Sequence, residues 1–352
     1  MISSDEKQNN MNGSFSFFGP MGMALNENGN AIEETQTVKL ILTVYLGITM
    51  ILSIIGNVLT CAVIARDKTM RTPTNYYLLN LALTDLMIAL FIPIEIYIVW
   101  IPDFYPLGEE CCRIHFVLLD CLSNCSLLTI FAFTIERYLV VTRPFLRQKL
   151  MLNRRVFKIV ALVWVVACVF CIPDVFYIDL LERDKDIYCY FFRPFELRVF
   201  LIVEILVFFI VPGAVLFILY VLIALKLKSV QTKLRSSPAD SRHNRDKAVK
   251  MLAAVAASFY FCWTPYCIYR IMIVIPEFDY KQYYNVWRIM NYLSYNGYAS
   301  TAVNPILYSL MSRKFRQAFK DCFKECKSRP GVRKDTSRRG LQNIAVLHLQ
   351  YN

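Results

Sequence analysis

The sequence is poor in charged residues and in histidine. Only 19% of its 352 residues are Asp, Glu, Lys or Arg, and only 3 are histidine, whereas soluble domains are about a quarter charged. An intramembrane hydrolase would need paired aspartates, a Ser/His pair or a His-Glu-x-x-His zinc helix, and His115, His243 and His348 lie in no such setting. The sequence therefore predicts that this protein is not an enzyme and holds no resident cofactor or catalytic metal.

Long apolar runs dominate the chain instead. Apolar residues make up 56% of it, and the run from Leu40 to Ala65 contains no charge. As a helix this run would reach ~39 Å, more than the ~30 Å hydrocarbon core of a membrane. Similar runs lie within 205–225, 251–269 and 289–312, and apolar stretches interrupted by charge lie within 74–100, 112–141 and 156–176. We predict an all-α membrane protein, a seven-transmembrane helix bundle.

The net charge of +12 is distributed in a way that indicates a membrane topology rather than nucleic-acid binding. Positively charged loops stay on the cytoplasmic side of a membrane. Of the 39 Lys and Arg residues, 28 lie within 66–71, 143–158, 226–250 and 313–339. We therefore expect a multi-pass plasma-membrane protein in contact with lipids, with its amino terminus extracellular and its carboxyl terminus cytoplasmic.

The chain divides into four predicted regions. They are a disordered extracellular tail over 1–37, the seven-transmembrane domain over 38–312, a short amphipathic membrane-surface helix over 313–327 and a cytoplasmic tail over 328–352. Asn12, in Asn12-Gly13-Ser14, fits a glycosylation acceptor. Cys322 and Cys326 are palmitoylation candidates at the membrane surface, and the alternative is that both are exposed reduced thiols.

Each predicted span carries a short motif, and the motifs follow one another in a fixed order. Glu136-Arg137-Tyr138 ends span three, and Asn304-Pro305-Ile306-Leu307-Tyr308 lies in span seven. The other motifs are Gly56-Asn57-Val58, Leu81-Ala82-Leu83-Thr84-Asp85, Trp164, Pro212 with Tyr220, and Phe259 to Tyr266, which includes Trp263-Thr264-Pro265. From Gly56 to Cys326 the chain resembles the rhodopsin-like (class A) G-protein-coupled receptors.

This resemblance implies a set of residues that switches the bundle between an inactive and an active packing. Pro265 and Pro305 each remove a helical hydrogen bond and so permit two packings. In similar receptors Trp263 acts as the toggle and Arg137 meets a heterotrimeric G protein, with arrestin and receptor kinases as further partners. The implied set is Asp85, Glu136, Arg137, Tyr138, Tyr220, Trp263, Pro265, Asn304, Pro305 and Tyr308.

A sodium ion and a disulfide are also implied by the resemblance. The positions that hold an allosteric sodium ion in similar receptors are Asp85, Ser126, Ser300, Thr301 and Asn304. All five carry oxygen donors, as a hard cation requires, and the alternative is a hydrated hydrogen-bond network around a protonated Asp85. Cys112 and Cys189 correspond to the usual bridge of the family, and Cys111 is a neighbour that competes with it or stays free.

Several ligand classes are disfavoured by particular residues. Retinal needs a lysine in span seven, and 289–312 contains none. Amine receptors usually carry an aspartate where this chain has Leu119, with Asp120 one position further on, so amine binding is disfavoured. A small non-peptide ligand such as an amine is the first alternative to a peptide. A transporter is a remote alternative, because it would need inverted halves or broken helices, and the sequence indicates neither.

The charged residues of the outer third instead favour a peptide. The residues expected near the top of the bundle are Glu95, Asp120, Glu204, Tyr266, Tyr269 and Arg270. Pro93-Ile94-Glu95-Ile96-Tyr97 and the pair of Asp120 with Arg270 resemble the neuromedin U, pyrokinin, thyrotropin-releasing-hormone and ghrelin receptor group, which implies an amidated neuropeptide and Gq-linked calcium release. For a ligand ending in Arg-X-amide, we expect Glu95 and Asp120 to receive its guanidinium. The alternative is an internal Asp120–Arg270 ion pair that touches no ligand.

Overall fold

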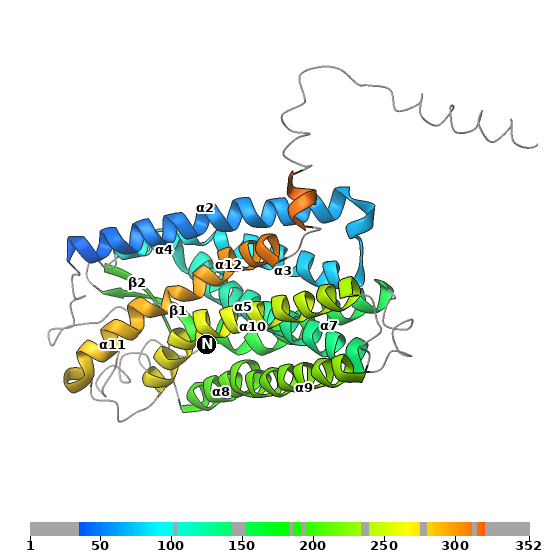
Figure 1. The fold of residues 1–352 in the computed structure, drawn as a ribbon. Coiled ribbons are helices and arrows are strands. Elements are labelled where there is room, and N and C mark those ends of the chain that lie inside the picture. Colours follow the sequence, from blue (N-terminus) through cyan, green and yellow to red (C-terminus); the bar gives the residue numbers. More distant parts are fainter. Residues whose placement is uncertain are drawn as a thin grey trace, which may run out of the picture.

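The computed structural model is a bundle of long helices (Figure 1). It describes residues 35–101, 104–142, 153–183, 186–191, 195–233, 239–274, 280–311 and 315–320. The predicted modification sites Asn12, Cys322 and Cys326 lie outside these residues.

The helices follow the predicted spans in order. They are α2 (Gln36–Arg66), the short η2 (Lys68–Met70), α3 (Pro73–Ala89), α4 (Ile92–Trp100), α5 (Gly108–Thr142), α7 (Asn153–Tyr177), α8 (Phe195–Ile205), η4 (Leu206–Ile210), α9 (Val211–Lys233), α10 (Ala239–Val274), α11 (Tyr280–Ser294) and α12 (Asn296–Met311). Among the described residues, five helical segments are long and apolar enough to cross a membrane, and they match predicted spans one to five. The last two predicted spans are α10 and the α11–α12 pair, which pack into the same bundle. The predicted helical-bundle fold class is confirmed.

Span two is broken between α3 and α4 rather than continuous. Pro93 has no N–H to donate to the carbonyl one turn earlier, and the chain passes through a turn at Leu90 and Phe91. The break starts a new helix, α4, whose buried face carries Glu95.

Span five contains a π-helical turn. This turn, η4, ends two residues before Pro212, whose missing N–H interrupts the regular pattern of α-helical bonds. The wider turn places Phe208 in the protein interior. A sequence pattern based on a regular helix does not predict this local change of register.

Span seven is also divided into two helices, which the uncharged run over 289–312 does not predict. Around Tyr295 the backbone makes tight bonds from Tyr295 N to Tyr292 O (3.3 Å) and from Tyr298 N to Tyr295 O (3.1 Å). The Ser294 hydroxyl donates to Asn291 O at 2.5 Å and so competes for a helical carbonyl. No proline marks this break, which separates α11 from α12.

A β-hairpin covers one end of the bundle, and this end is called the hairpin end below. Strands β1 (Ile178–Arg183) and β2 (Asp186–Phe191) pair antiparallel, with Leu180 opposite Cys189. Figure 1 shows the hairpin at the end of the bundle where α2 starts, and β1 packs against α5 and α7. The sequence patterns did not predict these strands.

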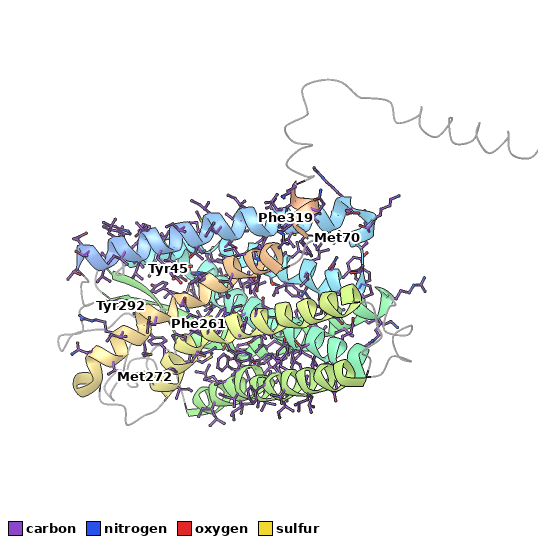
Figure 2. All side chains as sticks on the ribbon, in the orientation of Figure 1. Tyr45, Met70, Phe261, Met272, Tyr292 and Phe319 are labelled. Atoms are coloured by element: carbon purple, nitrogen blue, oxygen red, sulfur yellow. A yellow bond between two sulfur atoms is a disulfide. The ribbon has the colours of Figure 1, made fainter. Side chains whose placement is uncertain are left out.

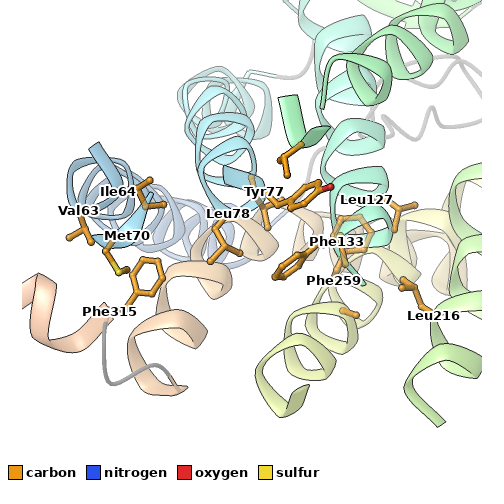
Figure 3. Close-up of a cluster of buried hydrophobic side chains, with 14 of the residues drawn as sticks. Val63, Ile64, Met70, Tyr77, Leu78, Leu127, Phe133, Leu216, Phe259 and Phe315 are labelled. Atoms are coloured by element: carbon orange, nitrogen blue, oxygen red, sulfur yellow. The ribbon is translucent and has the colours of Figure 1, made fainter. Parts of the chain in front are cut away.

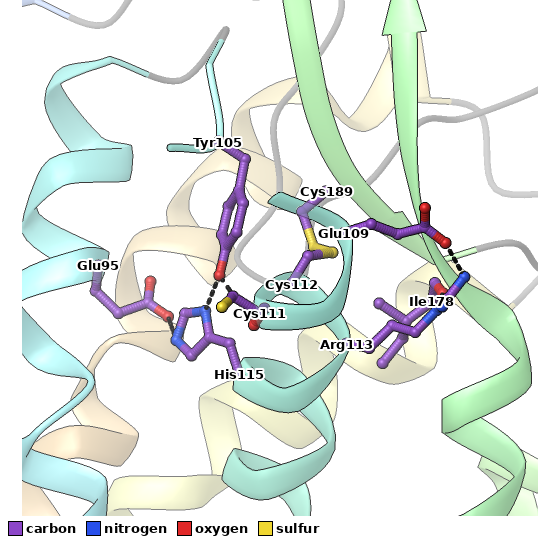
Figure 4. The surroundings of a disulfide bond; sticks show 9 residues. All are labelled: Glu95, Tyr105, Glu109, Cys111, Cys112, Arg113, His115, Ile178 and Cys189. Carbon is purple, nitrogen blue, oxygen red and sulfur yellow. Dashed lines mark hydrogen bonds and ion pairs between the residues drawn. A yellow bond between two sulfur atoms is a disulfide. The ribbon is translucent and has the colours of Figure 1, made fainter. Parts of the chain in front are cut away.

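The predicted disulfide between Cys112 and Cys189 is present and joins α5 to β2 (Figure 4). Their Cα atoms lie 5.9 Å apart across 77 residues of sequence. Arg113 Nε also donates to Ile178 O at 3.0 Å, so both strands of the hairpin are attached to α5. Cys111 is exposed and unbridged, so it does not compete for this disulfide.

The apolar core lies between the helices, and many apolar side chains also point outwards. In the largest core cluster Tyr77, Leu78 and Phe133 meet Phe259 (Figure 3). Phe261, by contrast, is 76% exposed on the outer surface of α10 (Figure 2). An outward apolar surface of this kind suits contact with lipid chains.

A helical segment over 315–320 lies within the predicted amphipathic helix. Its Phe315 is buried against the core cluster near Val63 and Met70 (Figure 3). The neighbouring Arg316 is exposed, so the described segment has an apolar and a basic side.

Candidate functional site

A guanidinium held between two carboxylates forms the centre of the candidate ligand site. Arg270 of α10 lies 3.5 Å from Asp120 of α5 and 3.0 Å from Glu204 of α8. Asn124, one turn after Asp120, donates to the other Glu204 oxygen at 2.9 Å. The Tyr266 hydroxyl donates to Asp120 at 3.1 Å, and its ring lies 5.5 Å from the guanidinium carbon. Four residues that the sequence predicted for the ligand site are therefore in contact, and the Asp120–Arg270 pair is present.

Two cavities border this ion cluster. One, of about 470 Å³, is bordered by Glu95, Asp120, Tyr266 and Tyr298. The other, of about 430 Å³, is bordered by Glu204, Arg270 and several aromatic rings. Asp120, Ser123, Trp263 and Tyr266 border both. The predicted ligand residue Tyr269 is buried and is not among the residues that border these two cavities.

Glu95 belongs to a separate polar network near the disulfide (Figure 4). Its Oε1 atom accepts from the Tyr298 hydroxyl at 2.8 Å and lies 3.3 Å from His115 Nε2. His115 Nδ1 in turn lies 3.4 Å from the Tyr105 hydroxyl. Burial raises the pKa of Tyr105, and the negative charge of Glu95 raises it further, so this hydroxyl keeps its proton. The second Glu95 oxygen, Oε2, is buried and has no hydrogen-bond partner among the described residues.

Trp263 lies beneath the cavities and connects two helices. Its indole N–H donates to the Ser300 hydroxyl of α12 at 3.1 Å. Its ring stacks on Phe259 and meets Tyr266 edge to face, with centroid distances of 5.7 and 5.5 Å. A change in what fills either cavity would therefore reach the contact between α10 and α12.

The buried centre of the bundle holds the five residues expected around sodium. Asn304 donates to Asp85 at 2.9 Å, and the Ser126 hydroxyl lies 2.9 Å from that of Thr84, the neighbour of Asp85. The Thr301 hydroxyl bonds to its own helix, at Tyr298 O. Among these five residues, Asp85 and Asn304 contact each other, while the Ser300 hydroxyl is engaged by Trp263.

At the opposite end of the bundle, the switch residues are only partly described. Glu136 is buried and accepts from the Tyr77 hydroxyl at 3.1 Å, and the Tyr220 hydroxyl lies 3.0 Å from that of Thr134. Tyr138 is half-buried on α5. The side chains of Arg137 and Tyr308 lie outside the described part, so their predicted contacts remain predictions.

Comparison with known proteins agrees with this geometry. The family model of the 7 transmembrane receptor (rhodopsin family) matches residues 56–308, which is most of the chain. The chain belongs to the rhodopsin family of seven-transmembrane receptors. It is therefore a multi-pass membrane receptor and not an enzyme.

Individual relatives of this chain are pyrokinin and neuromedin-U receptors. It is 30% identical to the pyrokinin-1 receptor of Drosophila melanogaster, over 79% of this chain and 78% of the relative. It is 31% identical to neuromedin-U receptor 2 of Mus musculus, over 77% and 72%. Identity to neuromedin-U receptor 1 of Mus musculus is 32%, over 75% and 68%. The predicted resemblance to the neuromedin U and pyrokinin receptor group is confirmed.

Sequence reasoning overlooked some polar residues of the receptor. Asp174 is a fully buried acid within span four, and the general rule that a charge within a membrane span usually has a role would have found it. Tyr298 lies seven residues before Pro305 in α12, but its contact with Glu95 depends on the break at Tyr295. No pattern in the sequence predicts that contact.

Proposed function

We propose that this receptor detects a short cationic neuropeptide and transmits its binding to a heterotrimeric G protein, with calcium release through the Gq class. The ligand is an amidated peptide ending in Arg-X-amide, and its guanidinium binds between Glu95 and Asp120. Support for a peptide comes from the neuromedin-U and pyrokinin receptors among the relatives.

The unpartnered oxygen of Glu95 is the observation that carries this proposal. Glu95 and Asp120 both border the cavity of about 470 Å³, and Glu95 Oε2 has no hydrogen-bond partner among the described residues. A buried carboxylate oxygen without a donor is costly unless a ligand supplies one. A guanidinium has five N–H donors in a planar fork that suits two carboxylates.

Charge balance in the outer half also favours a cationic ligand. Asp120 and Glu204 share one guanidinium, that of Arg270, and Glu95 adds a third carboxylate at the cavity of about 470 Å³, which Asp120 also borders. A ligand cation compensates the excess negative charge. The internal Asp120–Arg270 pair positions Asp120 and does not exclude ligand contact, because Asp120 still borders both cavities.

The proposed orientation places the hairpin end outside the cell at the plasma membrane. The bridge between Cys112 and Cys189 lies at this end, and disulfides persist in oxidising compartments. The basic loops then face the cytoplasm, where Arg137 meets the G protein. Arrestin, receptor kinases and inner-leaflet lipids would bind on that same side.

Neutral variants of the two acids test the proposal. We expect Glu95→Gln and Asp120→Asn each to weaken calcium release by synthetic Arg-X-amide peptides about 10- to 100-fold, because a hydrogen bond to a charged group is worth about 1.5–3 kcal/mol. A peptide carrying citrulline in place of arginine should be less potent than the arginine peptide on the wild type. On the Glu95→Gln and Asp120→Asn variants, the same exchange should reduce potency little further.

Glu110→Gln is the matched control, because this exposed acid lies at the same end and pairs with Arg113 outside the cavities. Its potency should equal that of the wild type at equal surface expression. Unchanged potency in both Glu95→Gln and Asp120→Asn would remove the proposed guanidinium site.

A further inference from the structure

A cluster of one thiol and two carboxylates lies behind the ion cluster, between α7 and α8. Cys171 and Asp174 are three residues apart on α7 and so share a helix face, and Glu204 approaches from α8. One potential ligand atom from each residue lies within 4.8 Å of the others, and all three residues are buried. We propose that Cys171, Asp174 and Glu204 form a binding site for a zinc ion.

Asp174 supplies independent support for a bound cation. Both of its carboxylate oxygens are buried, and neither has a hydrogen-bond partner among the residues that the structure describes. The Arg270 guanidinium forms ion pairs with Asp120 and Glu204, and it influences Asp174 only through its charge, without a hydrogen bond to either Asp174 oxygen. A buried carboxyl group requires a counter-charge or a proton, and a cation bound at this position would supply the counter-charge.

The donor set identifies the chemical class of the cation. Magnesium and calcium prefer six or more oxygen ligands, whereas zinc accepts a mixture of thiolate and carboxylate in a four-coordinate site. On binding, the Cys171 thiol would release its proton to solvent and coordinate as thiolate. Three protein ligands leave a fourth position for water.

A neighbouring amide would orient two of the three donors. Asn124 Nδ2 donates to Glu204 at 2.9 Å and lies 3.9 Å from the Cys171 sulfur. Hydrogen bonds of this kind fix the orientation of metal ligands. Glu204 can keep this bond while binding zinc, because each carboxylate oxygen has two lone pairs.

An ion fits this position better than part of a peptide. Glu204 borders the cavity of about 430 Å³, which provides a path for entry, whereas Cys171 and Asp174 are not among the residues that border either cavity. A peptide side chain would have to displace the helices to reach them. Since Glu204 also holds Arg270, zinc binding and ligand binding would influence each other reciprocally.

Thermal unfolding of the purified full-length receptor in detergent, without any peptide, tests the site. We expect micromolar Zn²⁺ to raise the melting temperature of the wild type, and Mg²⁺ and Ca²⁺ to leave it unchanged. Asp174→Asn and Cys171→Ser should each lose the zinc-dependent shift, and Asn124→Ala should need about 10- to 100-fold more zinc. Each shift compares one variant with and without zinc, so effects of the substitution on folding cancel.

Cys168→Ser is the matched control, because this exposed thiol lies one turn earlier on α7 and should leave the zinc shift intact. The proposal is overturned if the wild type shows no shift, if Mg²⁺ acts as well as Zn²⁺, or if both Asp174→Asn and Cys171→Ser respond like the wild type. None of these results depends on the identity of the peptide.

Discussion

At the scale of single residues, a close contact between the first and last spans depends on a glycine. A Cβ atom built on Gly56 of α2 would lie 2.6 Å from Cβ of Pro305 in α12. One residue further along α2, Asn57 Nδ2 donates to Thr301 O at 2.9 Å. Gly56 therefore allows the two helices to approach closely enough for this hydrogen bond to form. Small residues commonly have this role between membrane helices.

Replacing this glycine should separate the two helices. We expect Gly56→Ala to destabilise the receptor by about 1–3 kcal/mol, the usual cost of overpacking, as measured by its melting temperature in detergent. Gly47→Ala, in the same helix, is the matched control, because a Cβ there meets nothing within 4 Å. Gly47→Ala should be neutral or should stabilise by up to about 1 kcal/mol through helix propensity. Equal melting temperatures for the two variants would contradict the proposed close contact.

At the scale of elements, breaks in the helices place the polar groups of the site. The break before α4 turns Glu95 inwards, and the turn at Tyr295 brings Tyr298 to its oxygen. The π-helical turn η4 follows directly after Glu204 and Ile205 and precedes Pro212. Polar side chains thus converge where regular helical geometry is interrupted, and neighbouring groups can satisfy the freed backbone atoms there.

The disulfide should be the main attachment of the hairpin to the bundle. Cys189→Ser opens a loop of 77 residues, and the chain-entropy model values its closure at about 4.5 kcal/mol. We expect a large fall in melting temperature and in surface expression. Cys111→Ser is the control, because its exposed thiol is adjacent to Cys112 but unbridged. A Cys111→Ser variant as unstable as Cys189→Ser would show that Cys111, and not only Cys112, takes part in the bridge to Cys189.

The sequence predicts some of these elements and not others, for physical reasons. Uncharged runs and ordered motifs predict the bundle, because lipid requires continuous apolar helices. Intramembrane charges predict Asp120, Glu204 and Arg270 as one group, since such charges face inwards. The hairpin and the break at Tyr295 depend on packing between distant segments, so local patterns do not reveal them.

At the scale of the whole molecule, one chain of contacts runs from the cavities to the buried centre. Trp263 borders both cavities and donates to Ser300, and one turn further along α12 Asn304 donates to Asp85. Pro265 and Pro305 lie in the two helices that this chain connects. A ligand that prefers one packing of α10 against α12 would shift the whole bundle towards it.

A sodium ion at this centre would provide a second means of shifting that equilibrium. Asp85 is buried in the described structure, and a buried carboxylate requires a counter-charge or a proton. We propose that sodium supplies the counter-charge, with Ser126, Ser300, Thr301 and Asn304 as the remaining oxygen donors. By linkage, sodium at a concentration ten times its dissociation constant would stabilise the folded receptor by about 1.4 kcal/mol.

Replacing choline chloride by sodium chloride at constant ionic strength should therefore raise the melting temperature of the wild type. Asp85→Asn should remove this dependence, because the amide keeps the shape of the side chain but loses the charge. Glu136→Gln is the matched control, since Glu136 is also a buried carboxylate but lies at the opposite end of the bundle, bonded to Tyr77. It should retain the full sodium response. If Asp85→Asn and the wild type respond equally to sodium, the ion does not bind at Asp85, and the alternative of a hydrated network around a protonated carboxyl accounts for this centre.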